Sequence, residues 1–363
     1  MNAVKLPIDR LPELWPSELR GTNIGAVLHP ASVSATLVHS ARILEKFDGD
    51  LFRLGALFGP QHGYLGQTQD NMIEWQGYKH PRLGIPVHSL YGETREPTPD
   101  MLDGLEVLLI DLQDIGTRYY TFIWTMYLCL KACAGKGIRV LVFDRPNPIN
   151  GVTVEGPLPD PAYRSFVGLH PLPVRHGKTI GELAVLFRDE AFPDCELDLL
   201  PMEGWERTMW FDETGLPWVL PSPNMPTLET ATVYGGMCLL EATNISEGRG
   251  TSRPFELFGA PWIRGEEFAA ALNALELPGA YFREAYFQPT FHKYAGEICA
   301  GAQLHVTDRD RFLPFRTGVE IIRQTQASYG GSFEWKPPPY EYEYERLPIE
   351  VLIGGPVRSL FFD

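Results

Sequence analysis

Apolar and polar positions alternate at two different spacings through the first two hundred residues of the chain. Short runs rich in Val, Ile and Leu, such as 23–29 (NIGAVLH), are typical of strands buried on both faces. Longer segments with apolar residues three and four positions apart, such as 34–47, are typical of helices with one buried face. The predicted strands cover residues 23–29, 52–58, 85–91, 106–112, 138–144 and 195–202, and the predicted helices cover 34–47, 98–105, 120–137 and 179–192. Because helices separate most of these strands, we predict an α/β fold in which helices cover both faces of a parallel sheet.

The pattern changes at a segment rich in proline, residues 218–231 (WVLPSPNMPTLETA). Such a composition disfavours regular structure, so we interpret the segment as a hinge between two domains. Beyond it, predicted helices at 265–275 and 312–329 are mixed with short strand-like pieces. We therefore expect a parallel-sheet domain at residues 1–220 and a smaller α+β domain at residues 221–363.

Composition and charge narrow the possible partners. The 363 residues include 44% hydrophobic and 21% charged residues, an ordinary balance for a globular protein. The formal net charge of −15 disfavours nucleic-acid binding, which needs a basic surface, although a few arginines in a cleft can still bind a small anion. No feature of the sequence indicates an oligomeric state.

Cysteine usage and the apolar runs bear on the location of the chain. The five cysteines are widely spaced, and we predict buried free thiols. No apolar run is long enough to span a membrane, and residues 1–19 lack the apolar centre of a signal peptide. We therefore expect the chain as given to be cytoplasmic, or exported if a leader has been trimmed from it.

Polar loops follow four successive predicted strands. These loops are GPQHG after the strand at 52–58, GETREPT after 85–91, QDIGTRYYT after 106–112 and RPNPING after 138–144. In parallel α/β sheets, ligands bind beyond the carboxyl ends of the strands, which lie along one edge. Ordinary solvated turns would explain any one of these loops, but polar side chains after all four strands favour a binding site.

Familiar cofactor and catalytic motifs are absent from the sequence. The glycines of GPQHGYLG are not spaced as in a dinucleotide fingerprint, and no phosphate-binding G-x-x-x-x-G-K-[ST] occurs. Neither H-E-x-x-H nor G-x-S-x-G is present. We therefore expect no cofactor and no metal ion, and a nicotinamide enzyme, an ATPase, a zinc protease or an ordinary serine hydrolase is disfavoured.

Carboxylates with arginine, histidine, asparagine and tyrosine neighbours remain as candidate chemistry. Two carboxyl groups suffice for glycoside hydrolysis, one as the acid and the other, or the N-acetyl group of the substrate, to support the positive centre. On composition alone, the same residues fit many small-molecule binding proteins. Structural roles are also open: Asp144 could cap a turn, and Asp114 could pair with Arg118. His176 could be a loop residue with satisfied hydrogen bonds, and Glu182 could support the start of a helix.

Longer motifs resemble a known family. The segments GPQHG, IPVHSLYG, DLQDIGTRYYT, DRPNPING, SFVGLHPLPVRHGKTIGELA, PSPNMPT and EATNISEGRGTSRPFELFGAP occur in this order. Together they resemble the DUF1343 family, the exo-β-N-acetylmuramidases called NamZ or YbbC, from about Asn23 to the C-terminus. The resemblance implies a Rossmann-like N-terminal domain, a smaller C-terminal domain and an active-site cleft between them. It also implies release of terminal N-acetylmuramic acid from the non-reducing end of peptidoglycan fragments.

Site residues follow from the resemblance and from the polar loops together. We predict Glu93 and Glu74 as the general acid/base candidates, Glu247 as their partner or stabiliser, and Asp114 and His176 as groups that position substrate or water. The lactyl carboxylate of N-acetylmuramic acid gives a reason for arginines in an acidic protein, because a bidentate Arg contact would select it. The predicted substrate-binding residues are Gln61, His62, Arg95, Arg118, Tyr120, Asn147, Glu155, Asn224, Asn244 and Arg249.

One position departs from the family pattern. Family members commonly have a glutamate where Gln61 stands, and a glutamine neither donates nor accepts the catalytic proton. In one interpretation, Glu74 or Glu93 has taken the acid role and Gln61 binds substrate. In the other, the chain is a non-catalytic muramyl-sugar binding protein or a hydrolase of a related amino sugar. A phosphoryl-group hydrolase is a third alternative, which the lack of a phosphate loop disfavours.

Overall fold

The computed structural model describes residues 3–361, and the chain divides into two compact units. The first unit comprises residues 1–116, 120–152 and 177–223, and the second comprises 117–119, 153–176 and 224–363. Residues 117–119 and 153–176 therefore belong to the second unit although they lie within the first 220 residues of the chain.

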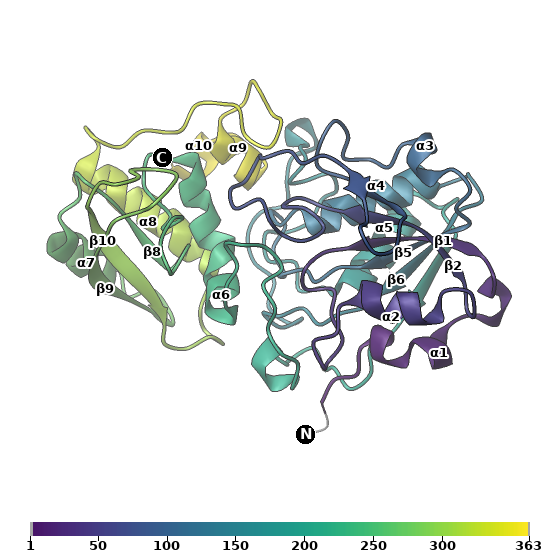
Figure 1. The fold of residues 1–363 in the computed structure, drawn as a ribbon. Coiled ribbons are helices and arrows are strands. Elements are labelled where there is room, and N and C mark those ends of the chain that lie inside the picture. The colour runs from purple at the N-terminus through teal and green to yellow at the C-terminus, as the bar shows by residue number, and fades with distance from the viewer. Residues whose placement is uncertain (1–2, 362–363) are drawn as a thin grey trace. The chain divides into compact units, whose positions relative to one another are not determined.

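A seven-stranded sheet forms the centre of the first unit, with strand order β3-β4-β2-β1-β5-β6-β7 (Figure 1). The strands are β1 (Asn23–Leu28), β2 (Arg53–Gly59), β3 (Tyr78–Lys79), β4 (Pro86–Ser89), β5 (Val107–Asp111), β6 (Arg139–Phe143) and β7 (Leu197–Leu200). All neighbours are parallel except β3 and β4. Every residue of β5 is buried, as expected for a continuous apolar run covered on both faces.

Helices cover this sheet on both faces. The helical segments of the first unit are η1 (Pro7–Arg10), α1 (Leu11–Leu14), η2 (Ser17–Leu19), α2 (Ser40–Phe47), α3 (Pro99–Leu102), α4 (Phe122–Cys133), α5 (Ile180–Ala191) and η4 (Phe211–Glu213). The crossover through α2 runs toward one edge of the sheet, and those through α4 and α5 run toward the other. Right-handed crossovers in opposite directions place their helices on opposite faces, as Figure 1 shows. The predicted Rossmann-like sheet is confirmed.

Local hydrogen bonds set where two of these helices begin. The helix predicted at 34–47 begins only at Ser40, because Ser34 Oγ accepts the backbone N–H groups of Thr36 and Val38 and holds a turn. The helix α5 begins after Thr179, as predicted. Thr179 Oγ1 accepts the Glu182 N–H, and the Glu182 carboxylate accepts the Thr179 N–H, so Glu182 does support the helix start.

The second unit contains a three-stranded antiparallel sheet and several helices. Its strands, in the order β8-β10-β9, are β8 (Leu257–Ala260), β9 (Ala280–Phe287) and β10 (Cys299–Val306). Its helical segments are η3 (Pro161–Tyr163), α6 (Leu228–Met237), η5 (Cys238–Ala242), α7 (Gly265–Asn273), α8 (Pro314–Tyr329), α9 (Pro348–Ile353) and α10 (Arg358–Phe361). Helices α6 and α8 meet at glycines: a Cβ at Gly318 would lie 2.2 Å from the Gly236 carbonyl oxygen. This smaller α+β unit was also predicted.

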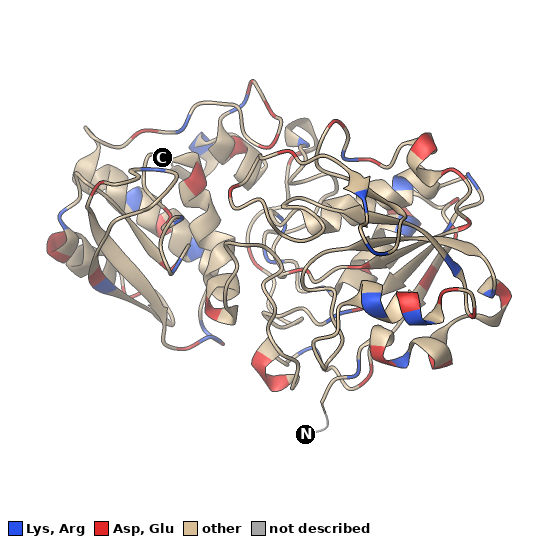
Figure 2. Ribbon diagram, in the orientation of Figure 1, with Lys and Arg blue, Asp and Glu red and all other residues tan. Residues whose placement is uncertain are grey.

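Surface and core composition agree with the sequence pattern. Figure 2 shows the charged residues mainly on helices and loops. All five cysteines are free and buried, as predicted: Cys129, Cys133, Cys195, Cys238 and Cys299. Among residues 3–361, no helix combines the length and the apolar character needed to cross a bilayer.

Candidate active site

The expected ligand position of the first unit lies between β1 and β5, where the strand order reverses. A buried ion pair fills this position. Arg145 Nε donates to Asp111 Oδ1 at 2.6 Å, and Arg145 Nη2 donates to Asp111 Oδ2 at 3.0 Å. Ser40 Oγ adds a hydrogen bond of 2.5 Å to Asp111 Oδ2. The charges of this pair are matched, so it serves to hold the ends of the strands together.

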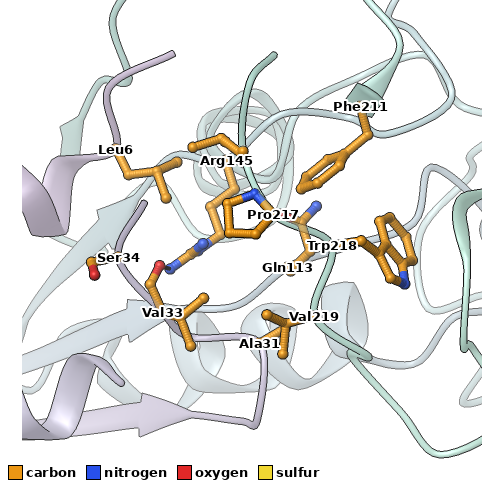
Figure 3. A pocket seen from close by; sticks show the side chains of 11 residues that line it. Leu6, Ala31, Val33, Ser34, Gln113, Arg145, Phe211, Pro217, Trp218 and Val219 are labelled. Carbon is orange, nitrogen blue, oxygen red and sulfur yellow. Dashed lines mark hydrogen bonds between the residues drawn. The ribbon is translucent and has the colours of Figure 1, made fainter. Parts of the chain in front are cut away.

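Only a very small cavity remains beside this ion pair. Figure 3 shows Arg145, Gln113 and Pro217 close together at its centre. Its volume is about 10 Å³. A cavity of this size holds about one water molecule, so a sugar does not fit here.

His29, which directly follows β1, is also buried in this region. Its Nε2 accepts the Gln113 N–H at 2.8 Å, and its Nδ1 lies 3.2 Å from the Pro221 carbonyl oxygen. These partners require a neutral ring with the proton on Nδ1. Burial is the main cause that lowers the pKa of His29 to about 3. His29 is therefore a structural residue at neutral pH.

A second group of polar side chains lies beyond β2 and β4, and we call it the Gln61 cluster: Gln61, Glu74, Trp75, Tyr91, Glu93, Arg95 and Thr121. Gln61 Nε2 donates to the Tyr91 hydroxyl at 3.0 Å, and Gln61 Oε1 accepts from Thr121 Oγ1 at 2.6 Å. The amide thus joins the loops that follow β2 and β4 to the start of α4. Neither Tyr91 nor Thr121 stands out in the sequence as a site residue, because aromatic and β-branched residues next to apolar runs resemble core residues.

The structure brings the two acid/base candidates of the first unit onto neighbouring segments. The Trp75 N–H donates to the Tyr91 carbonyl oxygen at 3.2 Å. Glu74 directly precedes Trp75, and Glu93 follows Tyr91 by two residues, so this hydrogen bond joins the segments that carry the two glutamates. Glu74 is half exposed and lies 3.4 Å from Arg95 Nη2. Glu93 is exposed and lines a pocket of about 420 Å³. Both carboxyl groups can therefore exchange protons with solvent, as an acid or base must.

Arg95, predicted to bind substrate, belongs to the same cluster. Its guanidinium carbon lies 5.5 Å from the centre of the Tyr91 ring, a distance at which a cation–π interaction is favourable. Contact with both Glu74 and Tyr91 orients the guanidinium fork at the edge of the cluster.

The other predicted site residues of the first unit have local partners. His62 has a positive φ of 69° and places Nδ1 2.8 Å from the Thr68 carbonyl oxygen. Asp114 is buried and accepts the Gly116 N–H at 2.7 Å. Asn147 is also buried and donates to the Lys178 carbonyl oxygen while it accepts the Ile149 N–H. The Asn147 amide thus holds two loops together. Tyr120 is buried, with 6% of its surface exposed.

In the second unit, Glu247 and Arg249 belong to a buried ionic group that we call the Glu247 network: Glu241, Glu247, Arg249, His292, Lys293 and Tyr340. Glu247 Oε2 lies 2.9 Å from Lys293 Nζ, and Glu247 Oε1 lies 3.1 Å from His292 Nδ1 and 3.4 Å from Arg249 Nε. Arg249 Nη2 donates to Glu241 at 2.7 Å, and the Tyr340 hydroxyl donates to the other Glu241 oxygen at 2.7 Å. Glu247 is fully buried.

The balance of charges in the Glu247 network fixes its protonation state. Burial alone would raise the pKa of Glu247, but Lys293, His292 and Arg249 outweigh it and hold the pKa well below its usual range. Glu247 therefore stays ionised at neutral pH. This state suits the predicted stabilising role better than that of a proton donor. The Arg249 guanidinium also lies 5.1 Å from the centre of the Phe255 ring, so it is held on several sides.

Two further predicted binding residues of the second unit bond backbone groups. Glu155 accepts the N–H groups of Phe315 and Arg316 at 3.0 and 2.8 Å, which caps the start of α8. Burial raises the pKa of Glu155. Arg118 is almost fully buried and donates to three backbone carbonyl oxygens, those of Pro157, Leu172 and Leu352. In the structure both side chains hold distant segments of the second unit together.

The remaining predicted residues of the second unit are Asn244, His176 and Asn224. Asn244 donates to the Ser332 carbonyl oxygen and accepts the Glu334 N–H, so it aligns these two segments. His176 and Asn224 are buried, with 2% and 5% of their surface exposed. Within the described part of the chain, no three His, Cys, Asp or Glu side chains are arranged to share a metal ion.

Comparison with known proteins identifies relatives along nearly the whole chain. The family described as exo-beta-N-acetylmuramidase NamZ, N-terminal, matches residues 24–229, and its C-terminal counterpart matches residues 232–358. The peptidoglycan beta-N-acetylmuramidase NamZ of Bacillus subtilis (strain 168) is 48% identical over 332 residues, which are 92% of this chain and 80% of that protein.

Two solved structures from Bacteroides fragilis are also similar, and both are described as DUF1343 family proteins. One has a TM-score of 0.87 and 32% identity, and the match covers 98% of this chain and 90% of the other. The second has a TM-score of 0.75 and 25% identity, with 99% and 91% covered. The architecture described above is thus shared by crystal structures of distant relatives.

Proposed function

Because the chain belongs to the NamZ family of exo-β-N-acetylmuramidases, also called DUF1343, we propose that it is a glycoside hydrolase acting on muramyl glycans. It would release terminal N-acetylmuramic acid from the non-reducing end of peptidoglycan fragments. The observation that carries this proposal is the 48% identity to the Bacillus subtilis peptidoglycan beta-N-acetylmuramidase over 92% of the chain.

The Gln61 cluster supports the proposal with two accessible carboxyl groups. Hydrolysis of a glycoside needs an acid that protonates the leaving oxygen and a group that stabilises the positive charge at the anomeric carbon. We assign the acid role to Glu93, which is exposed at a pocket and contacts no cation among the described residues. Glu74 has Arg95 at 3.4 Å, which suits a group that acts as a carboxylate. In this assignment Gln61 orients Tyr91 and Thr121 and transfers no proton.

Product analysis tests the substrate directly. The chain is incubated with the disaccharide MurNAc–GlcNAc and, separately, with its isomer GlcNAc–MurNAc, and the sugars released are identified by mass spectrometry. We expect free N-acetylmuramic acid from the first disaccharide and no cleavage of the second. Saturable binding of MurNAc–GlcNAc in calorimetry without any product would instead favour a non-catalytic muramyl-sugar binding protein.

Amide substitutions test the two carboxyl groups. Glu93→Gln and Glu74→Gln keep the size of the side chain but remove its acid/base function. We expect each to lower turnover of a chromogenic N-acetylmuraminide by about a hundredfold or more, the usual scale for loss of a general acid or base. Glu18→Gln, at an exposed glutamate on the surface of the first unit, is the matched control. If both site variants retain the parental rate, the assignment is wrong.

A further inference from the structure

An open groove begins at Glu93 and continues along the outer edge of the seven-stranded sheet. It consists of two adjoining pockets of about 420 and 610 Å³. The first is lined by Trp75, Gln76, Gly77, His88, Ser89, Glu93, Thr94, Thr98 and Met101. The second is lined by Gly77, Tyr78, Lys79, Gly84, Pro86, Val87 and His88. Because the two pockets share Gly77 and His88, they form one continuous surface, which we call the edge groove.

Close backbone packing creates the edge groove. A Cβ at Gly77 would lie 2.8 Å from the Val87 carbonyl oxygen, and one at Gly92 would lie 3.0 Å from the Trp75 carbonyl oxygen. A side chain at Gly77 would require the backbone of β4 to move, and one at Gly92 would be tight, so glycine lets the segment before β3 lie close to β4 and to the loop after it.

The lining of the first pocket has the chemistry of a sugar site. Ser89, Thr94 and Thr98 carry hydroxyl groups, and the exposed Gln76 carries an amide. Trp75 is buried, with 5% of its surface exposed, and the half-buried Tyr78 lines the second pocket. A few hydroxyl and amide groups at an open pocket suit the hydroxyl groups of a pyranose.

The position of Glu93 decides which part of the substrate the edge groove takes, if the proposed function holds. A general acid gives its proton to the glycosidic oxygen, which departs with the sugar on the reducing side of the bond. An exo-acting enzyme must enclose the terminal sugar, whereas the reducing side continues as a chain. The edge groove contains Glu93 in its first pocket and continues beyond it as a second open pocket. We propose that the edge groove binds the glycan on the reducing side of the cleaved bond.

The charges along the edge groove indicate which sugar of the glycan lies in which pocket. The sugar next to the cleaved bond is N-acetylglucosamine, which is neutral and would meet the uncharged groups Gln76, Thr94 and Thr98 near Glu93. The following sugar is N-acetylmuramic acid, whose lactyl group is a carboxylate. Lys79 lines only the second pocket and is exposed, so its ammonium group is placed to meet that carboxylate. The enzyme would therefore prefer fragments of three or more sugars over the disaccharide.

Charge reversal at Lys79 tests this arrangement. We measure kcat/KM for a chromogenic N-acetylmuraminide, for MurNAc–GlcNAc and for the tetrasaccharide MurNAc–GlcNAc–MurNAc–GlcNAc. Lys79→Glu should lower kcat/KM for the tetrasaccharide by about tenfold or more, mainly through KM, and should change the other two by less than about threefold. Lys46→Glu, at an exposed lysine of α2, changes the net charge equally and should leave all three values unchanged.

A steric variant tests the first pocket. Gln76 is exposed, so Gln76→Trp fills the pocket without burying a polar group. It should lower kcat/KM for the disaccharide and the tetrasaccharide by about tenfold or more. Ala327→Trp, at an exposed position of α8, is the control for adding a tryptophan.

The outcomes separate the edge groove from the activity itself. Lys79→Glu could change kcat/KM equally for the disaccharide and the tetrasaccharide, or change neither. Either result would overturn the proposed role of the edge groove, while turnover by the wild type would still support the muramidase activity. A wild-type chain that hydrolyses none of the three substrates would overturn the proposed function, and the groove proposal with it.

Discussion

The Gln61 cluster and the Glu247 network contain similar residues in opposite environments. In the Gln61 cluster, Glu74 is half exposed and Glu93 is exposed, and a neutral amide joins the neighbouring loops. In the Glu247 network, Glu247 is fully buried and in contact with three cationic or titratable side chains. Two groups rich in carboxylates therefore differ in whether water can reach them.

This difference separates proton transfer from fixed charge. An accessible carboxyl group can lose and regain its proton in each turnover. A buried carboxylate surrounded by cations keeps its charge, and its removal leaves those cations without compensation. We expect substitutions of the accessible carboxyl groups in the Gln61 cluster to change turnover more than stability, and substitutions in the Glu247 network to change stability first.

The largest expected effect is the loss of stability in Glu247→Gln. The amide removes the negative charge that Lys293, His292 and Arg249 share. Breaking a buried ion pair on one side costs about 3–5 kcal/mol, and we expect a loss of this size in the free energy of unfolding. Unfolding in urea, followed by circular dichroism, measures it.

A surface pair of the same unit provides the control for this prediction. Glu320 pairs with Arg323 at 3.1 Å on the partly exposed side of α8. Glu320→Gln should cost less than about 1 kcal/mol, as is usual for surface pairs. If Glu247→Gln unfolds as the control does, burial of the network does not matter and the comparison fails.

A pH-dependent effect is expected at His29, where burial holds a titratable group neutral. Its pKa is lowered from 6.5 to about 3, so its contribution to stability is fully present above pH 6.5 and is lost as the pH falls toward 3. Each pH unit below 6.5 costs about 1.4 kcal/mol, or about 3 kcal/mol at about pH 4.5. His29→Gln should flatten this loss, because an amide can replace both hydrogen bonds without titrating.

The difference between the wild type and His29→Gln isolates His29 from another titrating group. Burial raises the pKa of Asp144 to about 6, so the stability it contributes is present below pH 3.8 and is lost as the pH rises through 6. Both proteins share Asp144, so its contribution cancels. Thermal unfolding at a series of pH values provides the measurement. Parallel curves for the two proteins would show that His29 does not titrate in this way.

Much of the first unit could be predicted from its apolar runs. The predicted strands at 23–29 and 138–144 agree with β1 and β6 within one residue at each end, because strands of a covered parallel sheet are apolar throughout. The helix α2 begins six residues later than predicted, because hydrogen bonds to the Ser34 side chain stabilise a turn instead of a helix in this segment. Apolar spacing does not report such local competition.

The candidate site was only partly predictable. The strand-end rule selects Gln61 and Glu93, since loops after neighbouring strands meet at one edge of the sheet. The same rule does not tell whether a polar side chain faces a ligand or the backbone, and Asn147 bonds backbone groups in the structure. The burial of Glu247 depends on Lys293, which is 46 residues away in the chain. Such distant pairing leaves no local pattern.

The smallest expected effect, and the sharpest test of the Gln61 cluster, is that of Gln61→Glu. The Thr121 hydroxyl already donates a hydrogen bond to the side chain at position 61, at 2.6 Å. The Tyr91 hydroxyl now accepts a hydrogen bond from the Gln61 amide, and it can rotate to donate one to a carboxylate instead. The free energy of unfolding should therefore change by less than about 1 kcal/mol. If Glu93 carries the catalytic proton, turnover of the chromogenic muraminide should also stay within about threefold.

Gln61→Leu is the contrasting variant, because it removes the hydrogen bonds that Gln61 makes with Thr121 and Tyr91. It should cost about 1–3 kcal/mol of stability, the range for unsatisfied buried polar groups. A rise in turnover of about tenfold or more in Gln61→Glu, without a change in stability, would give position 61 the proton-transfer role that we assign to Glu93. The turnover rate of Gln61→Glu relative to that of the wild type therefore decides whether position 61 or Glu93 carries the catalytic proton.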